Sequence, residues 1–325
     1  MKSYPLVVII ISNYNGASYF YKGHSILWNV FSSLKKTKYR SYKVILADDA
    51  STDGSIKYVK TKFPTVSIVL NSTNGGFSKN NNNAMIYAFK KYKPDYILLL
   101  NNDIIVVDSL WLNKLVELAE SDDKIGLIGC KLVYPDRRIQ HAGIEIGYYG
   151  GRNIGRGQMD FSQFEYKKEV DGVTFAAALI KKKVIEKIGL LDENFFMGFE
   201  DTDYSIRAKK ANFKIFYDGD VKLIHLEGFS STNSTFQKIK LESFFYNQVN
   251  FWYFRLKYKS LKQFRGLNKL RSVFIFLFGA IVSIENRNRE RKLSNIQLKN
   301  KPFIRLVLSI KAIIKARRLC SNTKS

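Results

Sequence analysis

Three short polar segments and one histidine carry the side chains of this chain that could do chemistry. The segments are Asp48-Asp49, Asn101-Asn102-Asp103 and Glu200-Asp201, and the histidine is His225. Carboxylate oxygens and imidazole nitrogens bind divalent cations, and a carboxylate can also take a proton from a hydroxyl group. Because two adjacent carboxylates resist ionising together, one member of the Glu200-Asp201 pair is favoured as a base near neutral pH.

Several common kinds of site are missing from the sequence. No GxGxxG follows the first apolar run and no GxxxxGK[ST] occurs, so neither a nicotinamide-type pyrophosphate cradle nor a phosphate loop is expected. The two cysteines, Cys130 and Cys320, lie far apart, which excludes a thiolate zinc site and a disulfide framework. The remaining carboxylates and amides suit hydrogen bonds to a base and a ribose, and a divalent cation that neutralises a diphosphate.

The polar segments follow apolar runs that predict buried strands. We expect strands over residues 6–11, 44–47, 66–70 and 96–100, and helices over 26–34, 55–62 and 80–91. This alternation predicts an open α/β sheet with right-handed crossovers, in which a ligand lies beyond the carboxyl ends of the strands. The polar residues that should converge there are Ser12 to Asn15, Asp48-Asp49, Asn71 to Gly76, and Asn101 to Asp103.

Each of these residues also has a purely structural interpretation. Asp48-Asp49 precedes residues that favour turns, and acids such as Glu200-Asp201 are favourable at a helix N-terminus. A lone histidine after an apolar strand, such as His225, is more often structural. Asn81 and Asn82 belong to an asparagine run in a lysine-rich chain. The order of these residues after successive predicted strands nevertheless favours a binding site.

Five ordered motifs resemble glycosyltransferase family 2, and most of all its rhamnosyltransferase-like members. The motifs are residues 10–16 (IISNYNG), 47–55 (ADDASTDGS), 74–78 (NGGFS), 100–103 (LNND) and 199–203 (FEDTD), with further matches at 140–143, 191–196 and 224–228. The resemblance spans about residues 4 to 230. It implies a GT-A fold, which is a Rossmann-like nucleotide-sugar-binding sheet. It further implies a dTDP- or UDP-type donor, a divalent metal (Mg²⁺ or Mn²⁺) and inversion at the anomeric carbon.

The resemblance also implies roles by position. Ser12, Tyr14 and Asp49 would line the pocket for the nucleotide base, with Asp49 accepting a hydrogen bond from it. Asp103 would bind the metal, with His225 as a second ligand. Asp201, or its neighbour Glu200, would be the catalytic base. The other residues expected to bind the nucleotide-sugar are Asn13, Gly76, Phe77, Asn81, Asn82, Asn101 and Asn102.

The sequence departs from the family pattern at two places. The metal-binding motif reads Asn101-Asn102-Asp103, with a single carboxylate, although this variant resembles the form in rhamnosyltransferase-like relatives. Ala176 stands where the family often has a glycine, which implies a differently shaped acceptor floor.

Positive charge is concentrated at the end of the chain. Residues 1–235 hold 32 Lys and Arg against 25 Asp and Glu, whereas residues 236–325 hold 21 against 3. This break predicts a catalytic domain over 1–235 and a basic, aromatic helical segment over 236–325. Residues 241–258 read as a helix that is apolar around most of its circumference, and residues 303–318 as a basic amphipathic helix suited to an anionic membrane. The uncharged run 273–284 is too short for the roughly 20 residues that span a bilayer.

The basic segment leaves three interpretations open, namely a membrane surface, nucleic acid and a homo-oligomer interface. Its aromatic residues cluster with aliphatic ones in helical patches, which argues against a nucleic-acid groove. The N-terminus runs into the short apolar stretch 6–11 without the longer apolar region and the small-residue cleavage site of an export signal, so a cytoplasmic chain is expected. We therefore expect a transferase at the cytoplasmic face of the cell membrane that acts on a lipid-linked or cell-surface glycan. The alternative is a nucleic-acid-binding or membrane-binding protein on a Rossmann-like scaffold without transferase activity.

Overall fold

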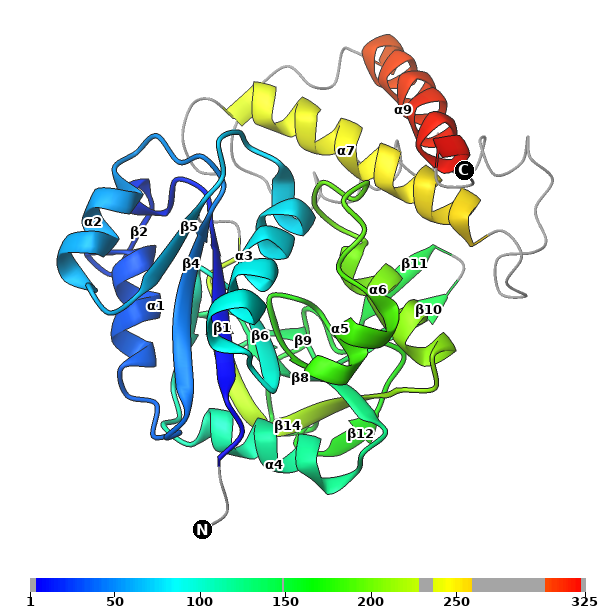
Figure 1. Ribbon diagram of the computed structural model, residues 1–325. Helices are drawn as coiled ribbons and strands as arrows, with labels where there is room; N and C mark the ends of the chain where they lie inside the picture. Colours follow the sequence, from blue (N-terminus) through cyan, green and yellow to red (C-terminus); the bar gives the residue numbers. More distant parts are fainter. Residues whose placement is uncertain (1–3, 148, 228–235, 259–301, 323–325) are drawn as a thin grey trace. The chain divides into compact units, whose positions relative to one another are not determined.

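A ten-stranded mixed sheet organises the larger of two units of the chain (Figure 1). The computed structural model describes residues 4–147, 149–227, 236–258 and 302–322. The two units are residues 1–237 and 238–325. Every residue assigned to the chemistry lies in the first unit, so the site can be described within that unit alone.

The strands of the large sheet include the four that the apolar runs predict. They are β1 (Val7–Asn13), β4 (Tyr42–Asp48), β5 (Ser67–Leu70), β6 (Tyr96–Asn101), β7 (Ile104–Val106), β8 (Ile125–Val133), β9 (Ile139–His141), β12 (Lys167–Glu169), β13 (Ala177–Lys181) and β14 (Lys214–His225). Their order is β12-β14-β8-β13-β6-β1-β4-β5, while β7 pairs with β14 and β9 pairs with β8. Two small hairpins stand apart from this sheet, β2 (Phe20–Tyr21) with β3 (His24–Ser25), and β10 (Ile144–Gly147) with β11 (Gly150–Asn153).

One half of the sheet is wholly parallel, whereas the other half is mixed. Strands β5, β4, β1 and β6 are parallel, as the alternation of strands and helices predicts. Strand β13 then runs antiparallel to both β6 and β8, and β14 runs parallel to β8. The short run of β13 gives no sign of this reversal in the sequence, because its direction depends on partners far away in the chain.

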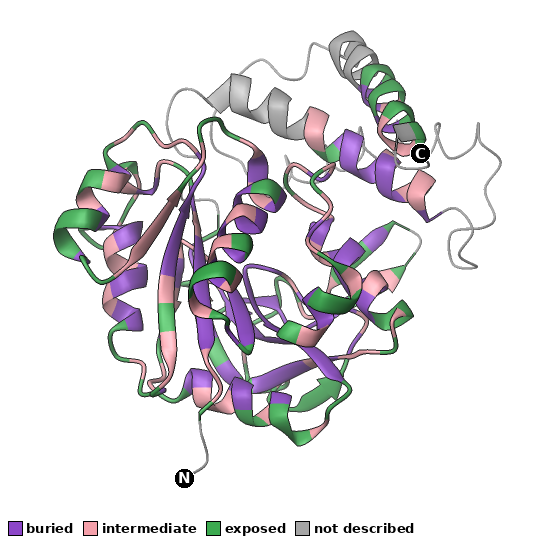
Figure 2. Cartoon of the chain, in the orientation of Figure 1, coloured by how far each residue is buried: buried purple, intermediate pink, exposed green. Residues whose placement is uncertain are grey.

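Helices cover both faces of the sheet because side chains of each buried strand point alternately to the two sides. The helices are α1 (Ile26–Leu34), α2 (Ser55–Lys62), α3 (Gly76–Tyr92), α4 (Trp111–Ser121), α5 (Lys182–Ile188) and α6 (Glu200–Lys210). Val7, Ile9 and Ile11 pack with α1, α2 and α4, whereas Val8 and Ile10 pack with α3, α5 and α6. Strands β1, β6, β8 and β13 are buried along most of their length, whereas the edge strands β5 and β12 are not (Figure 2).

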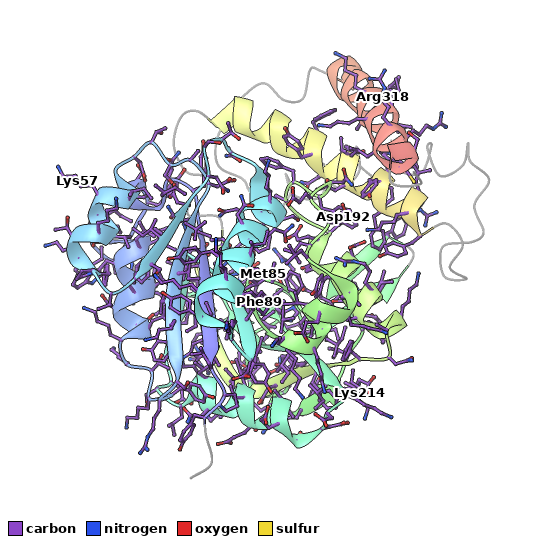
Figure 3. All side chains as sticks on the ribbon, in the orientation of Figure 1. Lys57, Met85, Phe89, Asp192, Lys214 and Arg318 are labelled. Carbon is purple, nitrogen blue, oxygen red and sulfur yellow. The ribbon has the colours of Figure 1, made fainter. Side chains whose placement is uncertain are left out.

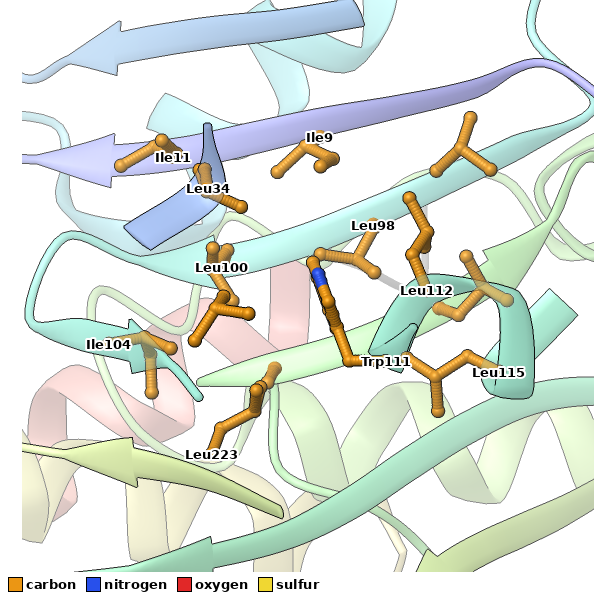
Figure 4. Close-up of a cluster of buried hydrophobic side chains, with 14 of the residues drawn as sticks. Ile9, Ile11, Leu34, Leu98, Leu100, Ile104, Trp111, Leu112, Leu115 and Leu223 are labelled. Atoms are coloured by element: carbon orange, nitrogen blue, oxygen red, sulfur yellow. The ribbon is translucent and has the colours of Figure 1, made fainter. Parts of the chain in front are cut away.

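Trp111 is the largest fully buried side chain in the first of these layers. It is fully buried beside Leu98 and Leu100 (Figure 4), and its ring nitrogen donates to Thr37 Oγ1 at 2.9 Å. In the opposite layer, Met85 lies on α3 against the sheet (Figure 3). These two layers make the strand ends a rigid platform for the polar residues that follow them.

The second unit contains two described helices, α7 (Phe236–Lys257) and α9 (Pro302–Asn322). Lys315 on α9 lies 5.6 Å and 5.2 Å from the ring centroids of Phe245 and Tyr246 on α7. Ile310 and Ile314 of α9 are 49% and 48% exposed. No helix in the described ranges is both long and apolar enough to cross a membrane. The predicted apolar run 273–284 lies outside the described residues.

Candidate active site

The polar residues at the strand ends converge, as the sheet topology predicts. The register of β1 places Asn13 beside Asp48 on one neighbour, and Ser12 beside Asn101 on the other. Asn13 Nδ2 donates to Asp48 Oδ2 at 2.7 Å, and Asn13 Oδ1 accepts from Asn102 Nδ2 at 2.8 Å. Asn13 is thus a buried link between the ends of three strands, β4, β1 and β6.

Asp49 organises the loop that leads into α3. Its carboxylate accepts hydrogen bonds from the backbone N–H groups of Gly75 at 2.9 Å and Gly76 at 2.8 Å, and from Asn71 Nδ2 at 2.9 Å. A carboxylate at a helix N-terminus satisfies free N–H groups and interacts favourably with the helix dipole. Helix α3 consequently begins at Gly76, four residues before the predicted start. The hydrogen bond that Asp49 is expected to accept from a nucleotide base stays a prediction.

Only glycine fits at position 76 without strain. Its φ of +82° lies in the left-handed region, and a Cβ atom there would collide with the carbonyl oxygen of Phe196. The same carbonyl accepts from the backbone N–H of Phe77 at 2.6 Å. The start of α3 is therefore bonded directly to the loop that precedes Glu200.

The asparagine run on α3 turns inward. Asn81 Oδ1 accepts from Ser12 Oγ at 2.8 Å, and Asn81 Nδ2 donates to the Phe77 carbonyl at 2.8 Å. Asn82 bonds to both backbone groups of Leu191, at 2.9 Å and 3.0 Å. Both amides are buried and serve to position neighbouring segments, so a donor contact by either of them stays a prediction. Tyr14, by contrast, is 50% exposed at the end of β1, where its ring is accessible to a base.

Asp103 and His225 lie together because β7 pairs with the end of β14. The antiparallel register aligns Ile104 with His225, and Asp103 Oδ1 is 3.0 Å from His225 Nε2. Burial lowers the pKa of His225, but the neighbouring Asp103 carboxylate outweighs this and raises it above its usual value. Asn101 Nδ2 lies 3.4 Å from the same ring nitrogen, so the asparagine motif and the histidine share one location.

The Asp103–His225 pair fits a divalent cation that the protein holds by two ligands. His225 Nδ1 is 2.7 Å from Gln140 Oε1, which leaves Nε2 to face Asp103. Asp103 Oδ1 is buried and, among the described residues, has no hydrogen-bond donor other than that ring. In the described part of the chain no three His, Cys, Asp or Glu side chains cluster as a metal site. Further ligands would have to come from a substrate or from water.

The acidic pair opens α6 in two different environments. Glu200 is buried with Oε2 unpaired, and burial together with the neighbouring Asp201 raises the pKa of Glu200 to about 8. Burial also raises the pKa of Asp201, but its Oδ1 accepts from Thr202 N at 2.6 Å and Thr202 Oγ1 at 3.1 Å. These hydrogen bonds favour charge on Asp201, whereas Glu200 is held as the neutral acid.

Two contributors to the site were not predicted from the sequence. Gln140 belongs to a matched motif but carries no predicted role, and it contacts His225 from β9. Phe196 supplies the carbonyl that joins the acidic helix to the donor loop. Both contacts join residues more than 80 positions apart, so local patterns hold no signal for them. His141, next to Gln140, is fully buried, and burial lowers its pKa to about 4, as suits a structural residue.

Known proteins resemble this chain in sequence and in fold. It is 29% identical over 208 residues to the O-antigen biosynthesis protein RfbC of Myxococcus xanthus, covering 62% of this chain and 16% of that protein. It is 22% identical over 224 residues to an N-acetylglucosaminyl-diphospho-decaprenol L-rhamnosyltransferase of Mycobacterium tuberculosis, covering 62% and 71%. The chain therefore spans only a small part of the first of these relatives.

The solved structure of GalNAc-T7 with UDP, GalNAc and Mn²⁺ superimposes with a TM-score of 0.55 at 15% identity, over 84% of this chain and 54% of that one. This likeness shows the GT-A fold. Residues 8–189, more than half of the chain, match the sequence profile of glycosyl transferase family 2. The strand-end amides, the Asp103–His225 pair and the acidic start of α6 thus lie on a chain that belongs to glycosyltransferase family 2.

Proposed function

We propose that the chain transfers a sugar from a dTDP- or UDP-type nucleotide-sugar to a hydroxyl group of a lipid-linked or cell-surface glycan, with inversion at the anomeric carbon. The observation that carries the proposal is the pairing of Asp103 with His225 at the end of the sheet. It provides a cation-binding pair next to amides suited to a nucleotide, in a family-2 chain.

The donor side is formed by the ends of β1, β4 and β6. Tyr14 offers an exposed ring to the base, and Ser12 and Asn102 offer polar groups beside it. Asp49 keeps the loop at Gly75 and Gly76 in place. Asp103 and His225 would hold the divalent metal, whose positive charge stabilises the departing nucleoside diphosphate when the metal is bound.

The acceptor side is formed by the start of α6. Asp201 takes the proton of the acceptor hydroxyl as its oxygen attacks the anomeric carbon, and the bond from that carbon to the diphosphate oxygen breaks. The raised pKa of Glu200 and the hydrogen bonds from Thr202 to Asp201 favour Asp201 as the member of the pair that carries the charge. Rhamnose as the transferred sugar is supported by the name of the mycobacterial relative.

A location at the cytoplasmic face of a membrane belongs to the same proposal. The mycobacterial relative is named for a decaprenol-linked acceptor. The exposed Ile310 and Ile314 of α9, flanked by Lys311 and Lys315, suit the surface of an anionic leaflet.

The test is donor hydrolysis measured with a panel of UDP-, dTDP- and GDP-sugars in Mn²⁺, in Mg²⁺ and in excess chelator. We expect hydrolysis of a pyrimidine nucleotide-sugar, and we expect chelation to abolish it.

Asp103→Ala should lose most of this hydrolysis activity while keeping the fold. Asp108→Ala is the matched control, because the Asp108 carboxylate pairs with Lys114 and accepts from the N–H of Leu110, both in its own segment. Full activity in chelator, or in Asp103→Ala, would refute metal dependence, and hydrolysis of GDP-sugars alone would refute the pyrimidine donor.

A further inference from the structure

We infer that Thr174 and the hairpin β10–β11 position the Asp201 carboxylate from outside its own helix, Thr174 by a direct hydrogen bond and the hairpin through Thr202. The inference rests on the proposed role of Asp201 as the base for its purpose. The state of the carboxylate can nevertheless be followed without any sugar transfer. Asp201 is partly exposed, so a substrate hydroxyl group can reach it, whereas Thr202 is only 3% exposed.

Two threonine hydroxyl groups from different segments donate to the Asp201 carboxylate. Thr202, the next residue on α6, donates to Oδ1 from its Oγ1 at 3.1 Å and from its backbone N–H at 2.6 Å. Thr174, in the segment between β12 and β13, donates its hydroxyl group to the same carboxylate. The Thr174 oxygen also accepts from the N–H of Ala176 at 3.4 Å, which directs its single hydrogen away from that N–H and toward Asp201.

The hairpin contacts the start of α6 at two glycines (Figure 1). A Cβ atom on Gly151 would lie 2.5 Å from Thr202 Oγ1, and one on Gly150 would lie 2.6 Å from Cε1 of Phe199. Only a residue without a side chain lets the hairpin come this close. The backbone at Gly151 therefore covers the Thr202 hydroxyl group on one side and limits the positions that it can take.

The same hairpin is bonded to the segment that carries Thr174. Ile144 on β10 exchanges backbone hydrogen bonds with Gly172, at 2.8 Å and 3.2 Å. Gly172 also packs on α6, because a Cβ atom there would lie 2.8 Å from Ser205 Oγ. A displacement of the hairpin would consequently move both hydroxyl groups that hold the carboxylate.

The charges on these elements stay in place when a threonine is replaced. Glu200 is the acid directly beside Asp201. Three ion pairs lie on the same elements, namely Asp203 with Arg207, Asp171 with Lys209, and Glu145 with Arg152. Because a threonine hydroxyl group is neutral, its removal alters the hydrogen bonds of the carboxylate and leaves these charges unchanged. A change in the titration of Asp201 can then be assigned to the lost donor.

The test follows the titration of Asp201 and the rate of transfer in the same variants. ¹³C-aspartate labelling reports the carboxyl group, and Asp201→Asn identifies its signal. Thr202→Val and Thr174→Val keep a branched side chain but remove the donor. Each should raise the pKa of Asp201, because a lost donor disfavours the charged form. Each should also lower turnover by about 10- to 100-fold through misplacement of the base, with nucleotide affinity unchanged.

Conservative variants separate this role from a merely structural one. Thr202→Ser and Thr174→Ser retain the hydroxyl group and should stay near the wild type in both readouts. Thr61→Val removes a hydroxyl group from an exposed position on α2 and should change neither. Folded Thr202→Val and Thr174→Val proteins with wild-type titration and turnover would overturn the inference. A raised pKa without any effect on transfer would uphold the positioning and refute Asp201 as the base.

Two alanine substitutions on the hairpin complete the experiment. Gly151→Ala places a methyl group against Thr202 Oγ1 and should change both readouts in the same direction as Thr202→Val. Gly147→Ala is the matched control, because it lies on the same hairpin with nothing within 4 Å of the added atom. Equal behaviour of the two alanine variants would overturn the role of the hairpin. If Gly151→Ala does not fold, the threonine variants decide the inference.

Discussion

At the scale of single residues, the adjacent carboxyl groups of Glu200 and Asp201 lie in different environments, and the environment of Glu200 favours the protonated form more strongly. Glu200 has no hydrogen-bond donor for its buried Oε2, whereas Asp201 accepts from two groups of Thr202. Burial penalises charge on both, and hydrogen bonds offset part of the penalty at each, but only Asp201 has the added side-chain donor Thr202 Oγ1. The two residues therefore need not share one proton equally. Substituting each residue in turn can distinguish their roles.

Asp201→Asn should lower turnover by about 10²- to 10⁴-fold, the usual contribution of a general base, while donor binding survives. Glu200→Gln should keep much of the activity, because glutamine resembles the neutral acid that the site holds. Steady-state transfer and equilibrium binding of the nucleotide check both expectations. Asp171→Asn is the control, because it alters an exposed ion pair with Lys209, which lies on α6 together with the acidic pair. The assignment is wrong if Asp201→Asn works normally and Glu200→Gln is inactive.

The raised pKa of Glu200 also predicts how stability depends on pH. Folding raises the pKa of Glu200 from 4.5 to about 8, so the folded state keeps a proton that the unfolded chain releases between those values. Its contribution to stability is complete below pH 4.5 and is lost as the pH rises through about 8.

Between pH 6 and pH 8.5 the wild type should therefore lose more free energy of unfolding than Glu200→Gln does, by roughly 1 to 3 kcal/mol. Urea unfolding of both proteins at the two pH values measures the difference. An equal loss in the two proteins would show that Glu200 is charged in the folded state throughout this range.

At the scale of elements, the donor loop and the acidic helix are bonded to each other. The carbonyl of Phe196 accepts from the N–H of Phe77 at the start of α3, and Asn82 on the same helix holds the backbone of Leu191. Asp49 in turn holds Gly75 and Gly76 from the end of β4. A displacement of the donor loop must consequently displace the segment that leads to Glu200.

Gly76→Ala tests this connection. A methyl group there meets the Phe196 carbonyl and also requires alanine at a φ of +82°, so we expect a loss of about 2 to 4 kcal/mol in the free energy of unfolding and a large loss of transfer. Gly157→Ala is the matched control, because its φ is +87° but nothing lies within 4 Å of the added atom. It should cost about 1 kcal/mol, from backbone strain alone. Equal effects of the two substitutions on unfolding and on transfer would disprove the coupling.

The elements also show what the sequence could and could not predict. The strands β1, β4, β5 and β6 were predicted because each contains a short apolar run, although β5 at the edge of the sheet is only partly buried, and helix α2 was predicted with its observed bounds. The start of α3 was placed too late, because the group that stabilises it is Asp49, 27 residues earlier. The pairing of β7 with β14 and the contact of Gln140 with His225 depend on tertiary structure, which local patterns do not encode.

At the scale of the whole molecule, the residues assigned to the reaction and most of the excess positive charge lie in different parts of the sequence. Every residue assigned to the chemistry precedes residue 228, while residues 236–325 carry 21 Lys and Arg against 3 Asp and Glu. On α9, Lys311, Lys315 and Arg318 are exposed, together with Ile310 and Ile314. Each basic residue near an anionic leaflet contributes up to about 1 kcal/mol to binding, less what salt screens.

Removal of residues 300–325 should release the protein from vesicles that contain anionic lipid and leave donor hydrolysis intact. Cosedimentation with vesicles and a hydrolysis assay measure the two effects, and transfer to a lipid-linked acceptor should fall. The full chain with Lys311→Glu and Lys315→Glu is a milder version that should bind vesicles less. Full sedimentation of the truncated chain would refute docking by α9, and a loss of self-association instead would assign the segment to an oligomer interface.

The position of β14 has a consequence for the chain while it is being synthesised. All nine residues of β8 are buried, and one of its edges is covered by β14, whose last residue is His225. At about 5 to 20 residues per second, the roughly 90 residues between Val133 and His225 take about 5 to 20 s to leave the ribosome. During that interval an apolar strand edge is open to pairing with other nascent chains. Prematurely terminated chains that end before Lys214 should therefore aggregate or be retained by chaperones, however complete their nucleotide-binding half is.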